Sequence, residues 1–235
     1  MNDKDIEEYH NIGKAIKKSE KYNYINGKQI TDPGTGTRVY EVNNYRLPSV
    51  TTILGATKNQ QFLKEWKAKV GEKEAERVKN TAGARGTKMH SILEGYIEGE
   101  NVLDLTETGG EAHRMANTII DQGFKDLDEI WGSEATLAYP GLYAGATDLV
   151  GIYQGRDSII DFKQSNKPKK AEWIEDYKLQ GAAYATAHDY MFKTSIEQIV
   201  ILMCTPDCFF QRFIINGKEF REYKWKWLER VNKYY

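Results

Sequence analysis

The chain has 235 residues, of which 40% are hydrophobic and 29% are charged, a composition that suits one folded domain or one domain with lobes. Its formal net charge of −1 excludes a globally cationic surface, although local positive charge beside an acidic pocket can cancel in the sum. No apolar run reaches the length of a membrane span, and the acidic start Met-Asn-Asp-Lys-Asp-Ile-Glu-Glu is unlike a signal or transit peptide.

The first fifth of the chain predicts short elements. Residues 1–21 are polar and partly amphipathic, which favours a helix. Asn26-Gly27 lies between two β-prone runs and predicts a two-residue hairpin turn. A glycine-rich turn at 32–36 and a short strand at 39–42 follow.

A helical region comes next. Ser49 is a plausible N-cap for the helix that begins at Val50. The helical segments that we expect are 50–54, 60–80, 87–97 and 111–130, with Gly83-Ala-Arg-Gly86 interrupting the region.

The remainder alternates strands with helices. We expect strands at about 134–139, 145–153 and 157–164, a helix at 173–190, strands at about 196–203 and 209–215, and a final helix rich in Trp and Tyr. This order predicts an α/β fold with a mixed central sheet flanked by helices and an N-terminal helical lobe.

Three charges lie in two otherwise apolar strands. Asp148 follows Gly-Ala-Thr, whereas Asp161 and Lys163 lie in Ser-Ile-Ile-Asp-Phe-Lys-Gln-Ser. Carboxylates on adjacent strands can hold one hard divalent cation, and Lys163 projects to the same side as Asp161 because strand side chains alternate. Charges buried there are costly unless they are paired or metal-bound, so the alternative is a buried Asp–Lys salt bridge. The pattern indicates metal-assisted hydrolysis of a phosphodiester.

The Asp-x-Lys triplet alone decides nothing. Three other segments fit the same pattern, namely Glu65-Trp-Lys67, Asp176-Tyr-Lys178 and Glu222-Tyr-Lys224. All three lie in predicted helices, where residues two apart do not face the same way. Only Asp161 and Lys163 lie on a predicted strand that follows another strand with an isolated acid.

Three further residues fit the same site. His90 lies on or near the apolar face of its helix, where a lone histidine is more often a core or capping residue. Gln180 and Tyr184 are four residues apart on the helix expected at 173–190, so they share one face. A simple hydrogen-bonded pair on the helix surface would fit the same spacing.

The two cysteines point to no metal chemistry. Cys204 and Cys208 flank Thr-Pro-Asp, and nothing supplies the further ligands of an iron–sulfur cluster. We expect two reduced thiols in a cytosolic protein and no iron–sulfur cluster.

In this order and spacing, the features resemble the PD-(D/E)xK nucleases of the RecB-like branch, and within it the mitochondrial genome maintenance exonucleases and their phage relatives. The resemblance covers roughly residues 45–235 and rests on Leu47-Pro-Ser-Val-Thr, the helix from Gly86 through His90 to Glu94, Ile160-Asp-Phe-Lys-Gln-Ser-Asn-Lys-Pro and Tyr223-Lys-Trp-Lys-Trp-Leu-Glu-Arg. The chain departs from the family pattern in having Ala146-Thr147 before Asp148 and Asp161 as the second acid, and it lacks the cysteines of the iron–sulfur members.

The resemblance implies a restriction-endonuclease-like fold. Residues 1–45 would form an N-terminal helix and hairpin extension. Residues 46–235 would form the nuclease domain, with a helical lobe at 46–131 and the catalytic sheet and flanking helices at 132–235. The location implied is the cytoplasm, that of the host if the chain is phage-encoded, and the protein would not be secreted.

The resemblance also assigns roles to residues. Asp148 and Asp161 would hold Mg²⁺ or Mn²⁺ together with the Phe162 backbone carbonyl and His90, and Lys163 would orient the attacking water or stabilise developing charge. Gln180 would position water or the scissile strand. The remaining candidates are substrate-binding residues: Glu134 (also a candidate outer-shell carboxylate), Tyr184, Arg85, Lys88, Lys167 and Ser49.

The implied activity is a divalent-metal-dependent DNA exonuclease that prefers single strands with a free end, with DNA as partner and no membrane. The alternatives are a structure-selective DNA endonuclease of the same fold and a catalytically silent DNA-binding module.

Overall fold

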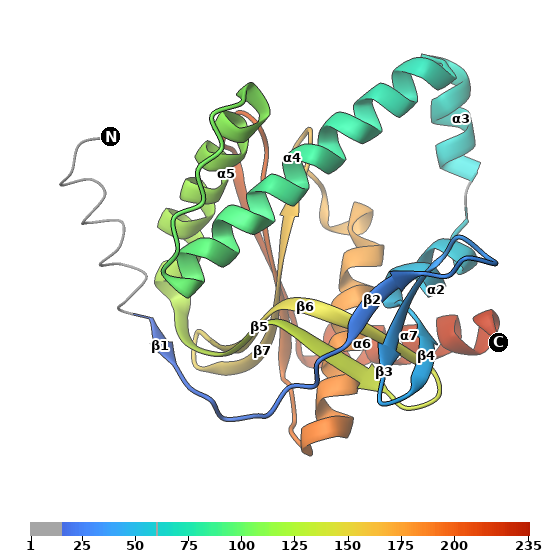
Figure 1. Cartoon of the computed structure of the whole chain (residues 1–235), viewed down its shortest axis with the longest axis vertical. Coiled ribbons are helices and arrows are strands. Elements are labelled where there is room, and N and C mark those ends of the chain that lie inside the picture. Colours follow the sequence, from blue (N-terminus) through green and yellow to red (C-terminus); the bar gives the residue numbers. More distant parts are fainter. Residues whose placement is uncertain (1–15, 60) are drawn as a thin grey trace.

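The computed structural model describes residues 16–59 and 61–235 (Figure 1). A mixed six-stranded sheet forms its centre, in the order β1-β5-β6-β7-β8-β9. The strands are β1 (Lys17–Lys18), β5 (Leu127–Tyr139), β6 (Tyr143–Tyr153), β7 (Arg156–Gln164), β8 (Gln198–Cys204) and β9 (Phe210–Asn216). β1 runs parallel to β5 and β7 parallel to β8, whereas the other neighbours are antiparallel.

Helices cover both faces of this sheet. They are α2 (Val50–Thr57), α3 (Gln61–Val70), α4 (Glu72–Glu98), α5 (Glu107–Gly123), α6 (Glu175–Phe192) and α7 (Gly217–Tyr234), with single 3₁₀ turns at Phe124–Asp126 and Ala171–Trp173. None of the described helices combines the length and apolarity that crossing a membrane requires.

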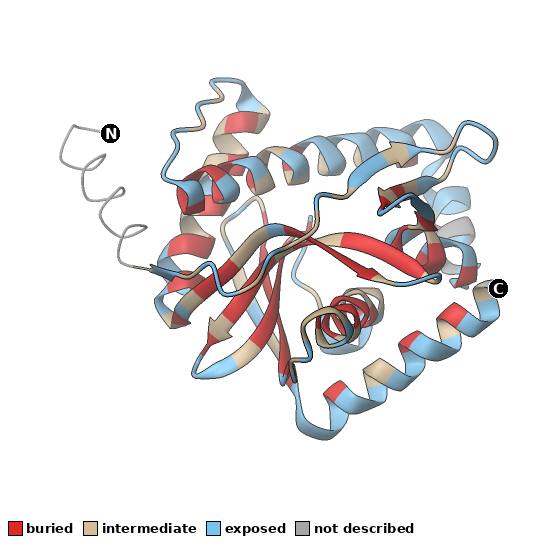
Figure 2. Cartoon of the chain, turned by 60° about the horizontal axis from the view of Figure 1, so that its bottom comes forward, coloured by how far each residue is buried: buried red, intermediate tan, exposed pale blue. Residues whose placement is uncertain are grey.

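The side chains of β7 alternate between two hydrophobic cores. Ile159 packs in the core that includes residues of α2, α6 and α7, whereas Ile160 packs in the core that includes residues of α4 and α5. Figure 2 shows the extensive buried surface of the central strands and the exposed outer face of α7. The predicted α/β fold with a mixed sheet flanked by helices is therefore confirmed.

A second, antiparallel sheet precedes the helices. It consists of β2 (Lys28–Thr31), β3 (Arg38–Val42) and β4 (Tyr45–Pro48) in chain order. A single parallel bridge between Ser49 and Ala144 joins its end to β6. The division that we expected at residue 45 falls inside β4.

The hairpin expected at Asn26-Gly27 is wrong. The turn that joins β2 to β3 is built around Asp32, whose carboxylate accepts the backbone N–H groups of Gly34 and Thr35 at 3.0 and 2.9 Å. Gly27 has another role, because a Cβ there would lie 2.4 Å from Thr136 Cγ2. Its small size lets the chain pass close over β5, so the glycine marks a close approach and not a turn.

The helix expected at 1–21 lies outside the described residues as far as position 15, and beyond that it is wrong. Lys17 and Lys18 form β1 and pair with Glu129 and Ile130 on the edge of the main sheet. The ammonium of Lys17 also lies 2.8 Å from the Glu129 carboxylate. Pairing with this sheet edge overrides the local helical pattern.

The interruption expected at Gly83–Gly86 is also wrong, since α4 runs unbroken for 27 residues. The charged segment 60–80, which we expected as one helix, is instead divided at Gly71. The φ of Gly71 is +85°, which glycine adopts at low cost. Gly83 and Gly86 both lie inside α4, where tertiary packing outweighs their low helix propensity.

The helix expected at 111–130 is shifted toward the N-terminus. Thr106 caps α5 by accepting the Gly109 N–H at 3.1 Å, and the helix ends at Gly123. Residues from Leu127 onward already belong to β5.

Candidate active site

Three carboxylates lie in one row across neighbouring strands. In the β5–β6 ladder, Ser133 pairs with Leu149 and Ala135 pairs with Thr147. This register places Glu134 opposite Asp148. The β6–β7 ladder ends one position before Asp148 and Asp161, so these two acids occupy opposite positions where the strands separate. Residues at opposite positions project to the same face, so acids far apart in sequence converge.

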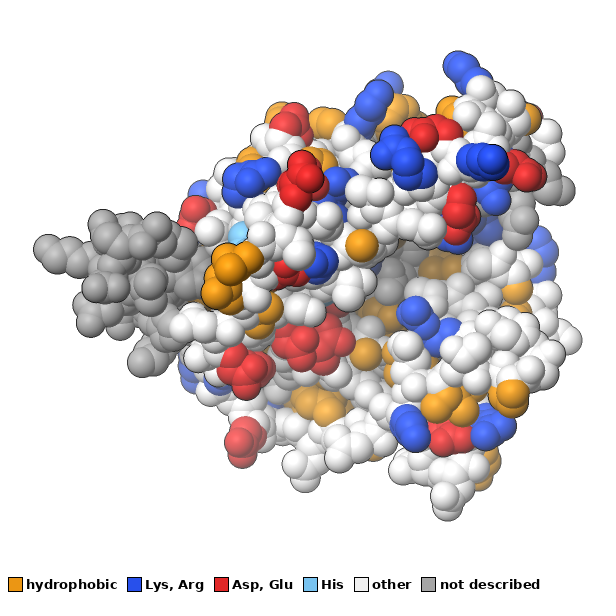
Figure 3. Space-filling model, turned by 45° about the horizontal axis from the view of Figure 1, so that its top comes forward, with side chains coloured by type: hydrophobic (Ala, Val, Ile, Leu, Met, Phe, Trp, Pro, Cys, Tyr) orange, Lys and Arg blue, Asp and Glu red, His pale blue; other side chains and the backbone are white. Residues whose placement is uncertain are grey.

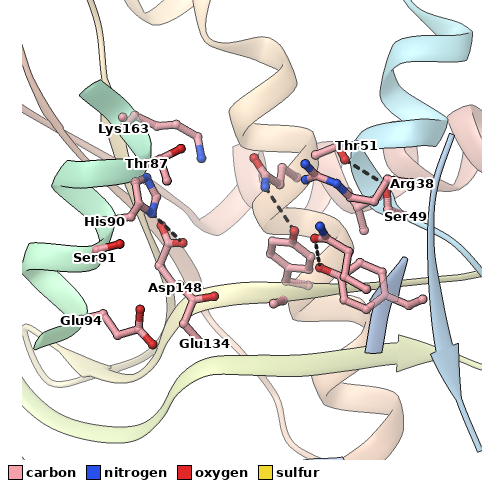
Figure 4. Close-up of a pocket in the computed structure, with 18 residues that line it drawn as sticks. Arg38, Ser49, Thr51, Thr87, His90, Ser91, Glu94, Glu134, Asp148 and Lys163 are labelled. Carbon is pink, nitrogen blue, oxygen red and sulfur yellow. Dashed lines mark hydrogen bonds and ion pairs between the residues drawn. The ribbon is translucent and has the colours of Figure 1, made fainter. Parts of the chain in front are cut away.

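Asp148 is held by backbone and side chain together. One carboxylate oxygen, Oδ2, accepts the N–H of Phe162 at 2.6 Å, which replaces the ladder hydrogen bond that ends here. The other, Oδ1, lies 3.2 Å from Nδ1 of His90 on α4 (Figure 4). Burial opposes ionisation of Asp148, but the neighbouring His90 and Lys163 lower the pKa of its carboxyl below the ordinary value. Asp148 is therefore a fixed anion.

Asp161 and Lys163 form a close ion pair. Their Oδ2 and Nζ atoms are 2.5 Å apart, and the Asp161 side chain is only 3% exposed. Burial raises the pKa of Asp161 to about 6, and the nearby Asp148 adds to this. Burial opposes the charge of Lys163, but Asp161 and Asp148 raise its pKa above the ordinary value, so the ammonium stays protonated. The buried Asp–Lys salt bridge, which the sequence offered as the alternative to a metal site, is thus present. It lies beside the carboxylates of Asp148 and Glu134.

Glu134 completes a cluster with metal-ligand geometry. One donor atom each of His90, Glu134 and Asp148 lie within 4.8 Å of one another. Although Glu134 is exposed, loss of hydration inside the cavity, and then the charges of Asp148 and Glu94, raise the pKa of its carboxyl to about 7. Crowded carboxylates beside an imidazole are a donor set that a divalent cation would stabilise.

These residues line a cavity of about 470 Å³. Figure 3 shows a hollowed face of the molecule with acidic and basic side chains at the edge of the hollow. The cavity wall includes His90, Glu94, Glu134, Asp148, Lys163, Gln180 and Tyr184. Asp161 does not line the cavity; it is buried and pairs with Lys163.

Gln180 and Tyr184 line the cavity as a bonded pair. The Gln180 amide donates to the Tyr184 hydroxyl at 3.1 Å, and Tyr184 is buried. A Cβ at position 145 would lie 2.8 Å from the Tyr184 ring, so Gly145 on β6 makes room for it. Ser49 also lines the cavity and caps α2, as predicted, by accepting the Thr52 N–H at 3.0 Å.

The three basic residues expected at phosphates differ in availability. Arg85 is buried and bonds to Gln164, Asn166 and Glu111, so it ties α4 to the end of β7 and to α5. Lys88 is paired with Asp104 and donates to Thr106. Lys167 is exposed. In this conformation Arg85 and Lys88 have partners of their own.

Several cavity residues were not predicted. Gln29, Arg38 and Tyr40 come from the second sheet, and Thr87 and Glu94 lie one turn before and after His90 on α4. The spacing of Glu94 from His90 is a helical i, i+4 signal that could have been found from the sequence.

No family model matches the sequence. The mitochondrial genome maintenance exonuclease 1 of Mus musculus is 28% identical over 222 residues, which cover 88% of this chain and 64% of the mouse protein. The Homo sapiens protein of the same name is 28% identical over 201 residues, which cover 80% of this chain and 58% of the human protein. The chain resembles a group of exonucleases.

This likeness confirms the predicted resemblance to PD-(D/E)xK-like nucleases. The chain spans less than two thirds of the length of either relative. A candidate exonuclease from Eubacterium rectale, whose crystal structure is known, superposes with a TM-score of 0.48 at 16% identity, covering 65% of this chain and 64% of that one.

Proposed function

We propose that the chain is a divalent-metal-dependent DNA nuclease, and more narrowly an exonuclease that prefers single strands with a free end. The observation that carries the proposal is the row of Glu134, Asp148 and Asp161 across three strands, with Lys163 and His90 beside it, at an open cavity. The names of the mouse and human relatives support the same class of activity.

The residues present fit a divalent cation. Asp148 and Glu134 offer hard oxygen donors and His90 offers a nitrogen, which suits Mn²⁺ as well as Mg²⁺. Asp161 and the Phe162 carbonyl remain candidate ligands. To bind the cation, the Asp161 carboxylate would have to contact the cation and the Lys163 ammonium at the same time. When bound, a divalent cation polarises the scissile phosphate and lowers the pKa of a bound water.

Lys163 acts by its charge in this proposal. Because its ammonium stays protonated, it is a poor acceptor for the proton of the attacking water. It can instead stabilise negative charge that develops on the phosphate, with Asp161 fixing its position at 2.5 Å. The ring of Tyr177, 5.2 Å from the ammonium, adds a second fixed contact.

Gln180 and Tyr184 would contact the scissile strand or its water. Both line the cavity, and their mutual hydrogen bond leaves the second N–H of the Gln180 amide for a ligand. Ser49 and Lys167 remain candidate substrate contacts.

Removing the Lys163 charge tests the catalytic assignment. We expect Lys163→Ala to lower the rate of release of nucleotides from end-labelled single-stranded DNA by roughly a thousandfold in Mg²⁺ or Mn²⁺. Lys224→Ala is the matched control, since Glu222-Tyr-Lys224 has the same triplet pattern but lies on α7. Equal activity of Lys163→Ala and the parent would show that the site is misassigned. Binding without cleavage by the parent would favour the silent DNA-binding module.

A closed single-stranded circle tests the need for a free end. We expect a linear oligonucleotide to be degraded and a circle of the same sequence to stay intact under identical conditions. Cutting of both substrates at similar rates would instead support the structure-selective endonuclease.

A further inference from the structure

The second sheet supplies the far wall of the cavity. Gln29 on β2 and Arg38 and Tyr40 on β3 line it. Figure 4 shows Arg38 beside Ser49 and Thr51, on the other side of the cavity from His90, Asp148 and Glu134. The cavity therefore has an acidic end and, across from it, an end with a guanidinium.

The backbone of Arg38 is fixed to the start of α2. Its carbonyl oxygen accepts the Ser49 N–H at 3.1 Å and the Thr52 hydroxyl at 2.7 Å. The β2–β3 ladder also pairs Arg38 with Thr31. The side chain consequently starts from a rigid point on the wall, although it is itself exposed.

The guanidinium of Arg38 forms no ion pair with a carboxylate in the described part of the chain. The other strong cation of the cavity wall, Lys163, is occupied by Asp161 at 2.5 Å. Arg46 on β4 provides a contrast, since its guanidinium lies 2.9 Å from Glu41 on the opposite face of the same sheet. Arg38 is thus a cation that faces the cavity and is available to an anionic ligand.

We propose that Arg38 binds a non-scissile phosphate of the DNA strand and thereby holds the strand in register across the cavity. A phosphodiester strand that reaches the acidic end needs a compensating cation elsewhere along its path, and a guanidinium can donate two parallel hydrogen bonds to one phosphate. The inference rests on the proposed function and gives Arg38 the role of a positioning residue.

The salt dependence of binding tests this contact. Binding of a labelled single-stranded oligonucleotide is measured by fluorescence anisotropy over a range of salt concentrations, in a Lys163→Ala background with Mg²⁺ so that the strand stays uncut. Each lost phosphate contact on a single strand reduces the slope of log K against log salt by about 0.7. We expect Arg38→Ala to show this reduction and to bind about tenfold more weakly at low salt. Arg38→Lys should keep the slope and bind with intermediate affinity.

Arg46→Ala is the matched control, because it removes the same charge from the other face of the same sheet. Its slope should equal that of the Lys163→Ala protein with native Arg38 and Arg46, which is the parent in these binding experiments. An unchanged slope in Arg38→Ala, an equal loss in Arg46→Ala, or no measurable binding by the parent would each overturn the assignment of Arg38.

A neutral-phosphate scan locates the contact. Methylphosphonate linkages are placed one at a time along the oligonucleotide. We expect the parent to lose affinity when one particular linkage, other than the cleaved one, is neutral. Arg38→Ala should be insensitive to the change at that same linkage. Sensitivity of both proteins at every linkage to the same degree would exclude the contact.

The two proposals fail separately. If the chain with native Lys163 degrades DNA in Mg²⁺ but Arg38→Ala keeps the parental slope and linkage profile, only the Arg38 assignment is wrong. If it does not degrade DNA but the Arg38 effects appear, the phosphate site stands and the nuclease is wrong.

Discussion

Glu134 is the residue whose substitution best separates cation binding from folding. Its carboxylate belongs to the cluster with His90 and Asp148, and the residue is exposed, so its substitution should disturb the fold little. We expect Glu134→Gln to weaken Mn²⁺ binding by at least about tenfold, because the amide offers a neutral oxygen in place of a charged one. The free Mn²⁺ signal in electron paramagnetic resonance measures this without any activity.

Glu129→Gln serves as the control for that experiment. Glu129 lies on the same strand, but its carboxylate pairs with Lys17 and accepts the Ser19 hydroxyl away from the cavity. Its substitution should leave Mn²⁺ binding unchanged. If both variants bind Mn²⁺ as the parent does, Glu134 is not a ligand.

The part of the site that lies on β6 and β7 could be predicted from the sequence. Isolated charges in apolar strands must have partners, so Asp148, Asp161 and Lys163 were conspicuous. Arg38 was not, since nothing local distinguishes it from Arg46 on the next strand. Only the packing of the second sheet against β6 and α2 places one arginine toward the cavity and the other away from it.

At the scale of elements, Gly83 and Gly86, two of the three glycines inside α4, lead to opposite expectations. A Cβ at Gly83 would meet nothing within 4 Å, whereas a Cβ at Gly86 would lie 3.2 Å from Gln164 on β7. Gly83→Ala should therefore stabilise the protein by about 0.5–1 kcal/mol, since alanine is the better helix former. Thermal unfolding should shift upward by about 2 °C for a chain of this size.

Gly86→Ala should give no such gain, because the new methyl group must displace Gln164, which accepts from Arg85. Equal stabilisation by both substitutions would mean that Gln164 yields freely. The pair also explains why the break expected at these glycines is absent. Glycine lowers helix propensity by an amount that a 27-residue helix packed on the sheet and α5 easily outweighs.

At the scale of the whole molecule, a buried histidine network joins the chain before β2 to α6. The Tyr24 hydroxyl lies 3.2 Å from Nε2 of His188, and the Thr194 hydroxyl lies 2.8 Å from Nδ1. Because the Thr194 hydroxyl donates to Asp189, it accepts from Nδ1–H, which leaves Nε2 to accept from Tyr24. The neutral ring is satisfied on both sides.

This network makes folding stability depend on pH. His188 is fully buried, and burial lowers its pKa to about 4, so below pH 6.5 the unfolded chain binds a proton that the folded chain does not. The contribution of His188 to stability should therefore fall by up to about 3 kcal/mol as the pH drops from 6.5 to about 4, whereas the raised pKa values of Glu134 and Asp161 act in the opposite direction over part of this range. Urea unfolding measured across this range tests it.

The stability of the parent relative to His188→Gln should therefore decrease as the pH falls from 6.5 to about 4, because the substitution removes only the His188 contribution. The stability of the parent relative to His113→Gln, which lies outside the network, should stay constant over this range. A difference in stability between the parent and His188→Gln that does not change with pH would falsify the assignment to His188.

One backbone angle at Glu134 favours a residue other than the one that the proposed cation site needs. Its φ is +46°, a left-handed conformation that costs a residue with a Cβ about 1–2 kcal/mol. Glycine would adopt this angle without strain and would also relieve the crowding of like charges, so Glu134→Gly should fold at least as stably as the parent. A search for more stable sequences on this backbone would then favour glycine over the carboxylate at this position. Stability-guided redesign of the chain should therefore hold position 134 fixed.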